Sequence, residues 1–402
     1  MNVVPIRSTL TGGRSQMATD IHVARVDVFN TMAAAEPHWR VLEHGDSLAT
    51  PYQRYDFLKL WQRHVGTDTG ISPFIVVGFN ATRQPLFLWP LGARHVGSLV
   101  GLEFLGGKHA NFNMGIWRRD VACSIDVKAL RAVLTQLAGR VDFISLISQP
   151  LTWGGATNPF ALLPHQRAAN HGFSGALVPD FDALLRARTN SDTRKKLRKK
   201  ERGLASFGEV RFERATAPDN VRRMLDAFFK QKTARMRGLG LPDIFSDAGV
   251  RRFIEAGAIE LQADGKPLIE LYALSVDDII VATLGGIAGG GRFCAMFNSM
   301  IQGRFAAESP GEQILLRVAR DCCERGFTTL DLGIGEARYK SILCEDPEPL
   351  FDSYLALSPA GRMFVFALSA GAVIKRTIKQ SPALWPMAQA VRRLRARLSS
   401  AP

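Results

Sequence analysis

An order of parts that occurs twice constrains the fold of this chain more than any other feature of its sequence. In the first half, residues 72–96 are predicted to form a strand, a turn and a strand, followed by a helix from Val127 and the strand "VDFISLI". In the second half, residues 267–300 are predicted to form three strands, followed by a helix from Ser309 and the strand "TTLDLGI". A glycine closes each of these helices. The repeated order predicts two α/β domains of the same plan.

The composition agrees with a folded protein of more than one domain. The chain has 402 residues, which is long for a single core, and 46% of them are hydrophobic and 22% charged. A basic helix is predicted between the two halves, in "RARTNSDTRKKLRKKERGLASFGEV", and a helix with one apolar face follows it. The second domain is therefore expected to begin near Phe181, and Pro359 marks the start of a C-terminal tail.

The net charge of +14 predicts attraction to an anionic partner. Polyanions, a membrane surface and an anionic small molecule all remain open on this ground. The predicted linking helix is the main source of the surplus, through Arg194, Lys195, Lys196, Arg198, Lys199, Lys200 and Arg202. Such a charge run is usually a solvated helix face, and the alternative is a rim that attracts an anionic acceptor.

Other features bear on location and metals. No apolar run is long enough for a membrane span and the N-terminus has no signal-like apolar stretch, so a cytoplasmic location is expected. The five cysteines include no C-x-x-C pair, so no disulfide framework and no metal site is expected. Residues 359–402 are expected to form a basic helical tail. This tail either packs one apolar stripe on the protein or lies peripherally on an anionic membrane surface.

The predicted helix at residue 309 begins with an unusual stretch, "AESPGEQILL". Ser309 is a preferred cap, Pro310 suits the first turn and Glu312 stands where a capping box needs it. The first N–H groups of a helix and its dipole attract anions, and Gly311 would let a ligand approach closely. An ordinary capped helix that binds nothing is the alternative interpretation.

A second stretch, "DLGIGEARYK" at residues 331–340, directly follows a predicted strand. Its glycines allow a tight turn, and Tyr339 and Lys340 offer a proton donor and a cation. Asp331 is the nearest carboxylate, although an aspartate at a strand end more often caps a loop. A solvated glycine loop is the competing interpretation.

Several common catalytic motifs are missing. The chain has no G-x-S-x-G elbow, no Walker loop and no G-x-G-x-x-G between a strand and a helix. All eight histidines lie at or before His171, so the second half can use an imidazole only if the two halves meet around a shared cleft.

Taken together, these segments resemble the acetyltransferases of the CelD/BcsL type, a branch of the GNAT superfamily associated with polysaccharide biosynthesis. In the second half the resemblance is carried by "KKLRKKERGLASFGEV", "SPGEQILL", "RGF" and "TTLDLGIGEARYK", and in the first half by "PYQRYDFLKLW", "FLWPL" and "EFLGG". It covers roughly residues 38–358. The expected fold class is therefore α/β with mixed sheets: tandem GNAT-like domains at 38–180 and 181–358, a flexible N-terminus at 1–37 and the helical tail at 359–402.

The resemblance implies acetyl-CoA or another acyl-CoA as co-substrate, bound by the second domain, and no metal. It implies donor contacts at Phe297, whose backbone N–H would serve an oxyanion, and at Arg304, Ser309, Gly311 and Glu312. Tyr339 would protonate the leaving sulfur, Lys340 would stabilise negative charge, and Asp331 is the candidate base. The anionic acceptor would meet Arg194, Arg198, Lys232 and Arg235. Asn298 and Ser299 depart from the family pattern, which often has an acidic residue there.

The leading hypothesis is thus an acyl-CoA-dependent N- or O-acyltransferase that acts on a sugar or surface-polysaccharide precursor. A Fem-like transferase that uses aminoacyl-tRNA is the first alternative, and the positive charge would suit it too. A non-catalytic GNAT-like module that binds nucleic acid or a protein is the second, although no nucleic-acid motif with stacking aromatics supports it.

Overall fold

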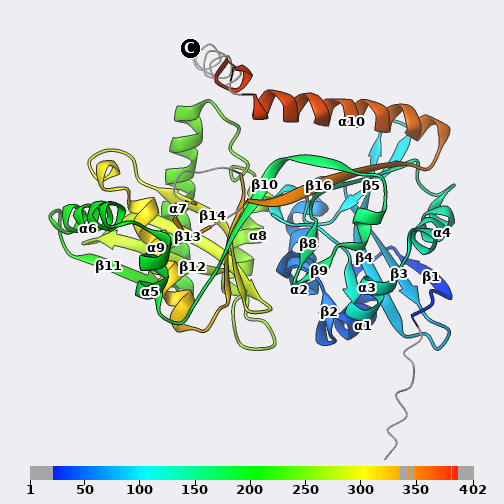
Figure 1. Cartoon of the computed structure of the whole chain (residues 1–402), viewed down its shortest axis with the longest axis horizontal. Helices are drawn as coiled ribbons and strands as arrows, with labels where there is room; N and C mark the ends of the chain where they lie inside the picture. The colour runs from blue at the N-terminus through cyan, green and yellow to red at the C-terminus, as the bar shows by residue number, and fades with distance from the viewer. Residues whose placement is uncertain (1–20, 336–339, 341, 345–346, 382, 388–402) are drawn as a thin grey trace, which may run out of the picture.

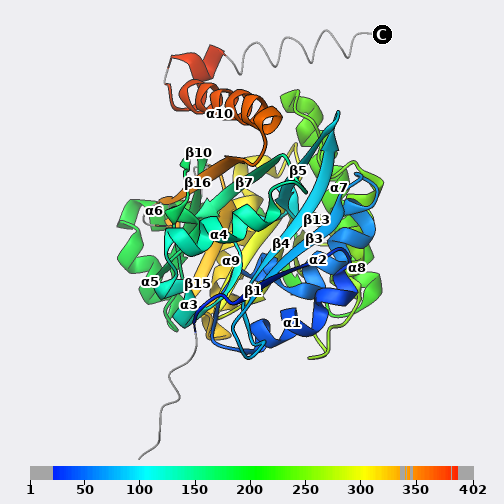
Figure 2. The same ribbon diagram turned by 90° about the vertical axis from the view of Figure 1, so that its right-hand side faces the viewer.

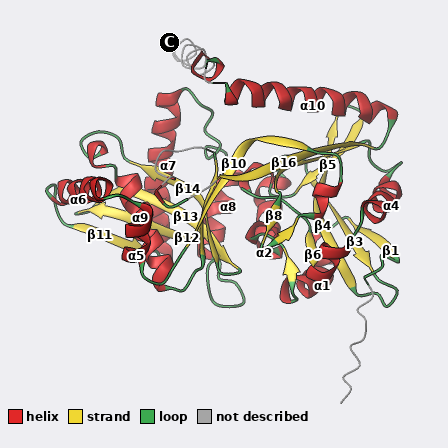
Figure 3. Ribbon diagram, viewed as in Figure 1, coloured by secondary structure: helices red, strands yellow, loops and turns green. Residues whose placement is uncertain are grey.

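A computed structural model describes residues 21–335, 340, 342–344, 347–381 and 383–387. Within this part of the chain, one mixed sheet runs through the whole molecule, with strand order β1-β3-β4-β5-β7-β16-β10-β15-β14-β13-β12-β11. Helices cover the sheet of each half (Figures 1 and 3). The mixed α/β class predicted from the sequence is confirmed.

The first half contains the predicted meander, helix and strand. The side-chain oxygen of Asn80 accepts a hydrogen bond from the Gln84 N–H. This bond closes the predicted turn between the first two strands of the meander. The elements of this half are β1 (Arg25–Phe29), α1 (Met32–His44), α2 (Tyr55–Trp61), β3 (Ser72–Phe79), β4 (Pro85–Val96), β5 (Leu99–Phe104), α4 (Val127–Leu137) and β7 (Phe143–Pro150).

The second half repeats this order after the basic helix. Positive φ angles at Asp277, Gly290 and Gly291 form the two predicted hairpin turns, and Gly326, with φ 78°, ends the helix as predicted. Its elements are α5 (Phe181–Arg188), α6 (Ser191–Ala205), β11 (Val210–Arg214), α7 (Pro218–Leu239), α8 (Ala248–Ile259), β12 (Glu270–Val276), β13 (Ile279–Gly289), β14 (Arg292–Met300), α9 (Pro310–Glu324) and β15 (Thr329–Ile334).

The two halves exchange strands at the middle of the sheet. β10 (Gln166–Ala176) follows the first half but pairs with β15 of the second, and β16 (Pro347–Ala356) follows the second half but pairs with β7 of the first. β10 and β16 also pair with each other, and Figures 1 and 2 show them side by side between the halves. Each half therefore completes the sheet of the other.

The hydrophobic core is continuous across the two halves. One apolar cluster extends from the first half to α7 and α8, where the rings of Phe57 and Phe253 meet edge to face at 5.3 Å. A second cluster lies between α9 and the strands of the second half. The core at the junction holds the two halves in one arrangement and positions the site described below.

The N-terminus differs from the expectation of a flexible segment over residues 1–37. Residues 1–20 lie outside the described part of the chain, whereas β1 pairs with β3 and Thr31 caps α1 through its side chain. β1 alternates Val26 and Val28 with polar residues, which is the pattern of an edge strand with one covered face.

Candidate functional site

The candidate site begins where β14 and β15 separate. The two strands pair in parallel only as far as Cys294 and Asp331, after which β14 continues to Met300 beside β13 alone. A β-bulge in β14 opposite Gly285 and Gly286 bends the strand at this point. The separation leaves a gap in the sheet that side chains from several elements line.

An inner cavity of about 190 Å³ occupies this gap. Asn111, from the first half, reaches into it and donates hydrogen bonds to the Ala295 carbonyl over 3.0 Å and to the Tyr52 hydroxyl over 2.9 Å. The other lining residues are Lys232, Leu284, Ala295, Met296, Phe297, Asn298, Leu315, Leu332, Gly333, Ile334 and Lys340. Both halves of the chain therefore contribute to the cavity.

An outer cleft of about 980 Å³ lies between α6, α7 and the start of α9. Five basic side chains line it, Lys196, Lys199, Lys200, Lys232 and Arg235, against the acidic Glu308 and Glu312. Lys200 and Glu312 pair at 2.6 Å. The remaining positive charge makes the cleft suitable for an anionic ligand.

Lys232 and Asn298 line both cavities and so lie between them. The Lys232 Nζ donates to the Asn298 carbonyl over 3.1 Å and lies 5.3 Å from the centre of the Phe245 ring. Burial, helped by the charge of Arg235, lowers the pKa of Lys232 below its ordinary value of 10.5. A half-buried amine with a lowered pKa between two cavities is a candidate for proton transfer.

The ladder between β13 and β14 determines which backbone groups face the gap. The Ile301 N–H donates to the Val281 carbonyl over 2.9 Å, and hydrogen-bonded pairs alternate along an antiparallel ladder. Phe297 therefore directs its N–H at β13, and its ring packs 4.6 Å from that of Phe228. Asn298 has the opposite orientation, as its bond with Lys232 shows. The structure thus turns the predicted oxyanion donor of Phe297 away from the gap.

The start of α9 lies in the cleft, but its cap differs from the predicted capping box. Ser309 is left-handed, with φ 50°, and its side chain accepts no capping hydrogen bond. Its carbonyl instead accepts the N–H groups of Glu312 and Gln313, over 2.9 and 3.2 Å. Glu312 is paired with Lys200, so its carboxylate is drawn towards α6. Two of the first-turn amides are thus used within the chain.

Gly311 is the first-turn residue that best fits the predicted close approach. It lines the outer cleft, and a Cβ atom there would lie 3.2 Å from the Met300 sulfur and otherwise have room. Ser309 and Glu312 line the same cleft. The structure therefore brings three of the predicted donor contacts to one wall.

Asp331 does not have the surroundings of a base. It is fully buried, its Oδ2 accepts from Arg292 over 2.9 Å and its Oδ1 accepts the Gly333 N–H over 2.7 Å. Burial raises the pKa of this carboxyl to about 7, against the opposing effects of Arg292 and the Gly333 N–H. Asp331 lines neither cavity, so it orders the end of β15 and the predicted catalytic role is withdrawn.

Lys340 lines the inner cavity, but its ammonium group is engaged with the backbone. Its Nζ donates to the carbonyls of Gly333, Ile334 and Gly335, over 3.1, 3.3 and 2.8 Å, which uses the three protons of an ammonium group. Burial lowers its pKa to about 8. Lys340 therefore binds the carbonyls at and directly after the end of β15, which occupies the ammonium protons that the predicted role in stabilising negative charge would need. Tyr339 lies outside the described residues.

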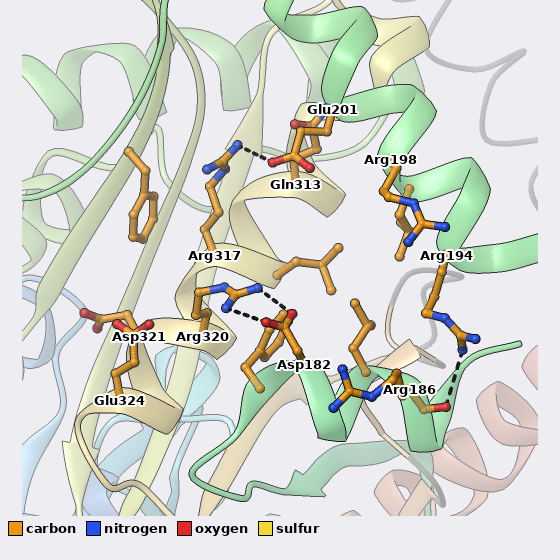
Figure 4. A pocket seen from close by; sticks show the side chains of 15 residues that line it. Asp182, Arg186, Arg194, Arg198, Glu201, Gln313, Arg317, Arg320, Asp321 and Glu324 are labelled. Carbon is orange, nitrogen blue, oxygen red and sulfur yellow. Dashed lines mark hydrogen bonds and ion pairs between the residues drawn. The ribbon is translucent and has the colours of Figure 1, made fainter. Parts of the chain in front are cut away.

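The predicted acceptor residues divide between two places. Lys232 and Arg235 line the outer cleft, whereas Arg194 and Arg198 point from the opposite face of α6 into a separate pocket of about 640 Å³ between α5, α6 and α9 (Figure 4). Two arginines of that pocket are already neutralised by ion pairs, Arg320 by Asp182 and Arg317 by Glu201. Arg304 is exposed and lies 4.6 Å from the ring of Phe305.

Sequence reasoning named the basic run as a possible rim but did not separate its two faces, and it missed Asn111. The periodicity of α6 could have identified Lys196 and Lys200, which are four residues apart and share a face with Thr193, as the basic residues of the cleft. No local signal marks Asn111, because the fold brings it to the gap from the other half. Among the described residues, no group of His, Cys, Asp and Glu side chains could hold a metal ion.

Comparisons with known proteins agree with this geometry. Residues 191–341 match the model of a family described as an acetyltransferase (GNAT) domain, and the matched segment contains α6, α7, α9 and the separating strands. A search of curated proteins gave no significant match.

Among solved structures, FemX is 12% identical, with a TM-score of 0.54 over 85% of this chain and 100% of FemX. A conserved protein of unknown function from Bacteroides thetaiotaomicron is also 12% identical (TM-score 0.49, 82% of this chain and 100% of that one). A tandem GNAT protein from the clavulanic acid biosynthesis pathway is 10% identical (TM-score 0.45, 83% and 99%). These likenesses concern the fold. Residues 191–341 thus match a GNAT-type acetyltransferase domain over a little more than a third of the chain, and this match supports an enzyme of the acyltransferase class.

Proposed function

We propose that this protein is an acyl-CoA-dependent N- or O-acyltransferase that acts on an anionic sugar or surface-polysaccharide precursor, as an enzyme of the CelD/BcsL type would. The observation that carries the proposal is that the lysine-lined outer cleft and the inner cavity lie next to each other and share Lys232 and Asn298 as lining residues. A charged, open compartment followed by a narrow one between strands suits a donor with phosphates at one end and a thioester at the other.

The residues present fit acetyl-CoA or another acyl-CoA as the donor. The phosphates would lie at the start of α9 beside Gly311, where Lys196 supplies positive charge. Leu315 and Leu332 give the inner cavity some apolar surface, which would suit a short acyl group. The donor, when bound, supplies the activated acyl group.

The chain must also remove a proton from the attacking amine or hydroxyl. Lys232 has the position for this step, because its Nζ faces both cavities and burial favours its neutral form. The neutral amine would accept the proton of the acceptor, while its bond to the Asn298 carbonyl keeps it oriented. Lys232 thereby takes the role of base that the sequence had suggested for Asp331.

The charge of the cleft supports an anionic acceptor. Lys199 and Arg235 are exposed at its rim, where they would attract a phosphorylated or acidic sugar. A cytoplasmic enzyme that receives its acceptor at the inner face of a membrane agrees with this chemistry.

Aminoacyl-tRNA is the alternative donor. The specific observation in its favour is the fold likeness to FemX together with the net charge of +14, which would suit a polyanionic nucleic acid. A module that binds without catalysis is a weaker alternative, because it would give no purpose to the half-buried amine of Lys232 between two cavities.

Titration of the purified protein separates these functions. We expect acetyl-CoA to bind saturably and to raise the melting temperature, and we expect free CoA to compete with it. If the protein binds charged tRNA but not acetyl-CoA, and its affinity for tRNA falls steeply with salt, aminoacyl-tRNA is the donor instead. Donor binding without turnover on any amine or hydroxyl acceptor from an extract of phosphorylated sugars would favour the non-catalytic module.

A further inference from the structure

The C-terminal helix α10 (Pro359–Gln380) lies along one side of the molecule (Figures 1 and 2). Its inner face contacts the body of the protein: the ring of Phe364 lies 4.6 Å from that of Phe143, and Arg376 donates to the Arg167 carbonyl over 3.1 Å. At Gly361 a Cβ atom would come within 1.9 Å of the Asp142 carbonyl oxygen. These contacts hold the helix against the body in a defined rotation.

The opposite face of α10 is apolar and exposed. Met363 is 80% exposed, Phe366 76% and Ile374 59%, and Val373 belongs to the same face at 39%. Helical spacing adds Ala367, Ala370 and Thr377 to this face, so the stripe carries no charge. A surface helix normally directs its polar side to water, so this stripe indicates a partner.

The charged residues that α10 itself carries are all basic. From Ser353 to the C-terminus the sequence contains eight basic residues and no acidic one. Arg362 and Lys375 belong to α10 itself and are exposed. An apolar stripe between basic residues is the pattern of a helix that lies in the interface of an anionic membrane.

Another exposed apolar group lies on the same side of the molecule. Leu239, Leu241 and Ile244, at and after the end of α7, are each more than a third exposed, and both views show this end of α7 on the side of α10 (Figures 1 and 2). Leu239 and Arg235 also line the outer cleft. A membrane that contacts α10 would thus lie near one rim of the cleft.

We propose that the outer face of α10 docks on an anionic membrane surface, with the helix lying parallel to that surface. A second copy of the chain is a poorer occupant, because two tails that each carry only positive charge would repel one another. A nucleic acid would leave Met363, Phe366 and Ile374 without apolar contacts. In the described part of the chain, no helix is both long and apolar enough to cross a membrane.

Vesicle sedimentation tests this surface. We compare vesicles of phosphatidylglycerol with phosphatidylcholine against vesicles of phosphatidylcholine alone, and expect binding to the first only. The double variant Phe366→Glu with Ile374→Glu should bind at least roughly tenfold more weakly, because it removes two apolar anchors and adds negative charge. The matched control is Leu162→Glu with Leu261→Glu, which changes two exposed apolar residues outside α10 and should bind as the wild type does.

Each contrary outcome overturns the proposal. Absence of binding to the anionic vesicles at low salt would exclude the membrane as partner. Equal losses in the α10 variant and in the control would show that net charge alone governs binding. Sedimentation velocity without lipid completes the test: a dimer that dissociates in the α10 variant would assign the stripe to a second copy. Circular dichroism confirms that both double variants are folded.

Discussion

Lys232 is the side chain on which the proposed chemistry depends most. Replacing it with methionine should lower turnover by about a hundredfold or more, the usual contribution of a general base, with little change in donor affinity. In the wild type, activity should rise with pH towards the lowered pKa of Lys232, and this limb should be lost in the variant. Lys230→Met is the matched control, because Lys230 is exposed on α7 and lines neither cavity. Equal activity of Lys232→Met would remove the assignment.

The environment of Lys340 predicts a pH dependence of stability. Its pKa is about 8 in the folded protein against an ordinary value of 10.5, so between these values the unfolded chain binds a proton that the folded chain has released. The free energy of unfolding should therefore rise with pH across this window, by about 3 kcal/mol relative to Lys340→Met.

Denaturant unfolding at a series of pH values measures this difference. Lys266→Met serves as a control, because Lys266 is exposed and its replacement should give a difference that does not vary with pH. A flat difference for Lys340→Met as well would mean that the amine is not buried as described.

Among the elements, α9 has the clearest test, at Gly311. Glutamate there would place a carboxylate beside the proposed phosphate position, and acetyl-CoA affinity should fall by about tenfold or more. Alanine should change affinity by no more than about threefold, because its Cβ meets the flexible Met300 side chain. Calorimetry on both variants gives the comparison. Similar affinities for the two variants would place the phosphates elsewhere.

The basic side chains of α6 fall into two sets that face different surroundings. The helical period places Lys196 and Lys200 towards the cleft, and it places Arg194 and Arg198 towards the pocket in Figure 4. The composition of the run predicted an anionic partner but could not distinguish these faces. Their different surroundings come from α7 and α9, which the run itself does not specify.

For the molecule as a whole, the exchange of β10 and β16 makes the two halves interdependent. Residues 181–402 expressed alone would lack β10, so β15 would lose its antiparallel partner and β16 would lose both of its neighbours. We expect this fragment to aggregate, since unpaired strand edges associate. Co-expression with residues 1–180 should restore a soluble complex, which size-exclusion chromatography detects. A monomeric fragment 181–402 with cooperative unfolding would contradict this expectation.

The inner cavity depends on the same interdependence. Asn111 comes from the first half and bonds to the Ala295 carbonyl of β14, close enough that a Cβ atom at Gly333 would lie 2.6 Å from its Nδ2. The site therefore belongs to neither half alone. The sequence had left open whether the two halves meet around a shared cleft.

The sequence alone determined the elements and their order. Helices, hairpin turns and the glycines that end helices depend on side-chain periodicity and on the backbone conformations open to a few neighbouring residues. The sequence also located the start of α9 at Pro310 and the positive charge that faces the cleft. Only the tertiary structure decided which groups are available for chemistry. Asp331 pairs with Arg292, Lys340 donates to three carbonyls, and the packing of the two halves brings Asn111 to the gap. Those outcomes depend on contacts between distant segments, and the packing of the whole chain sets the protonation and orientation of each group.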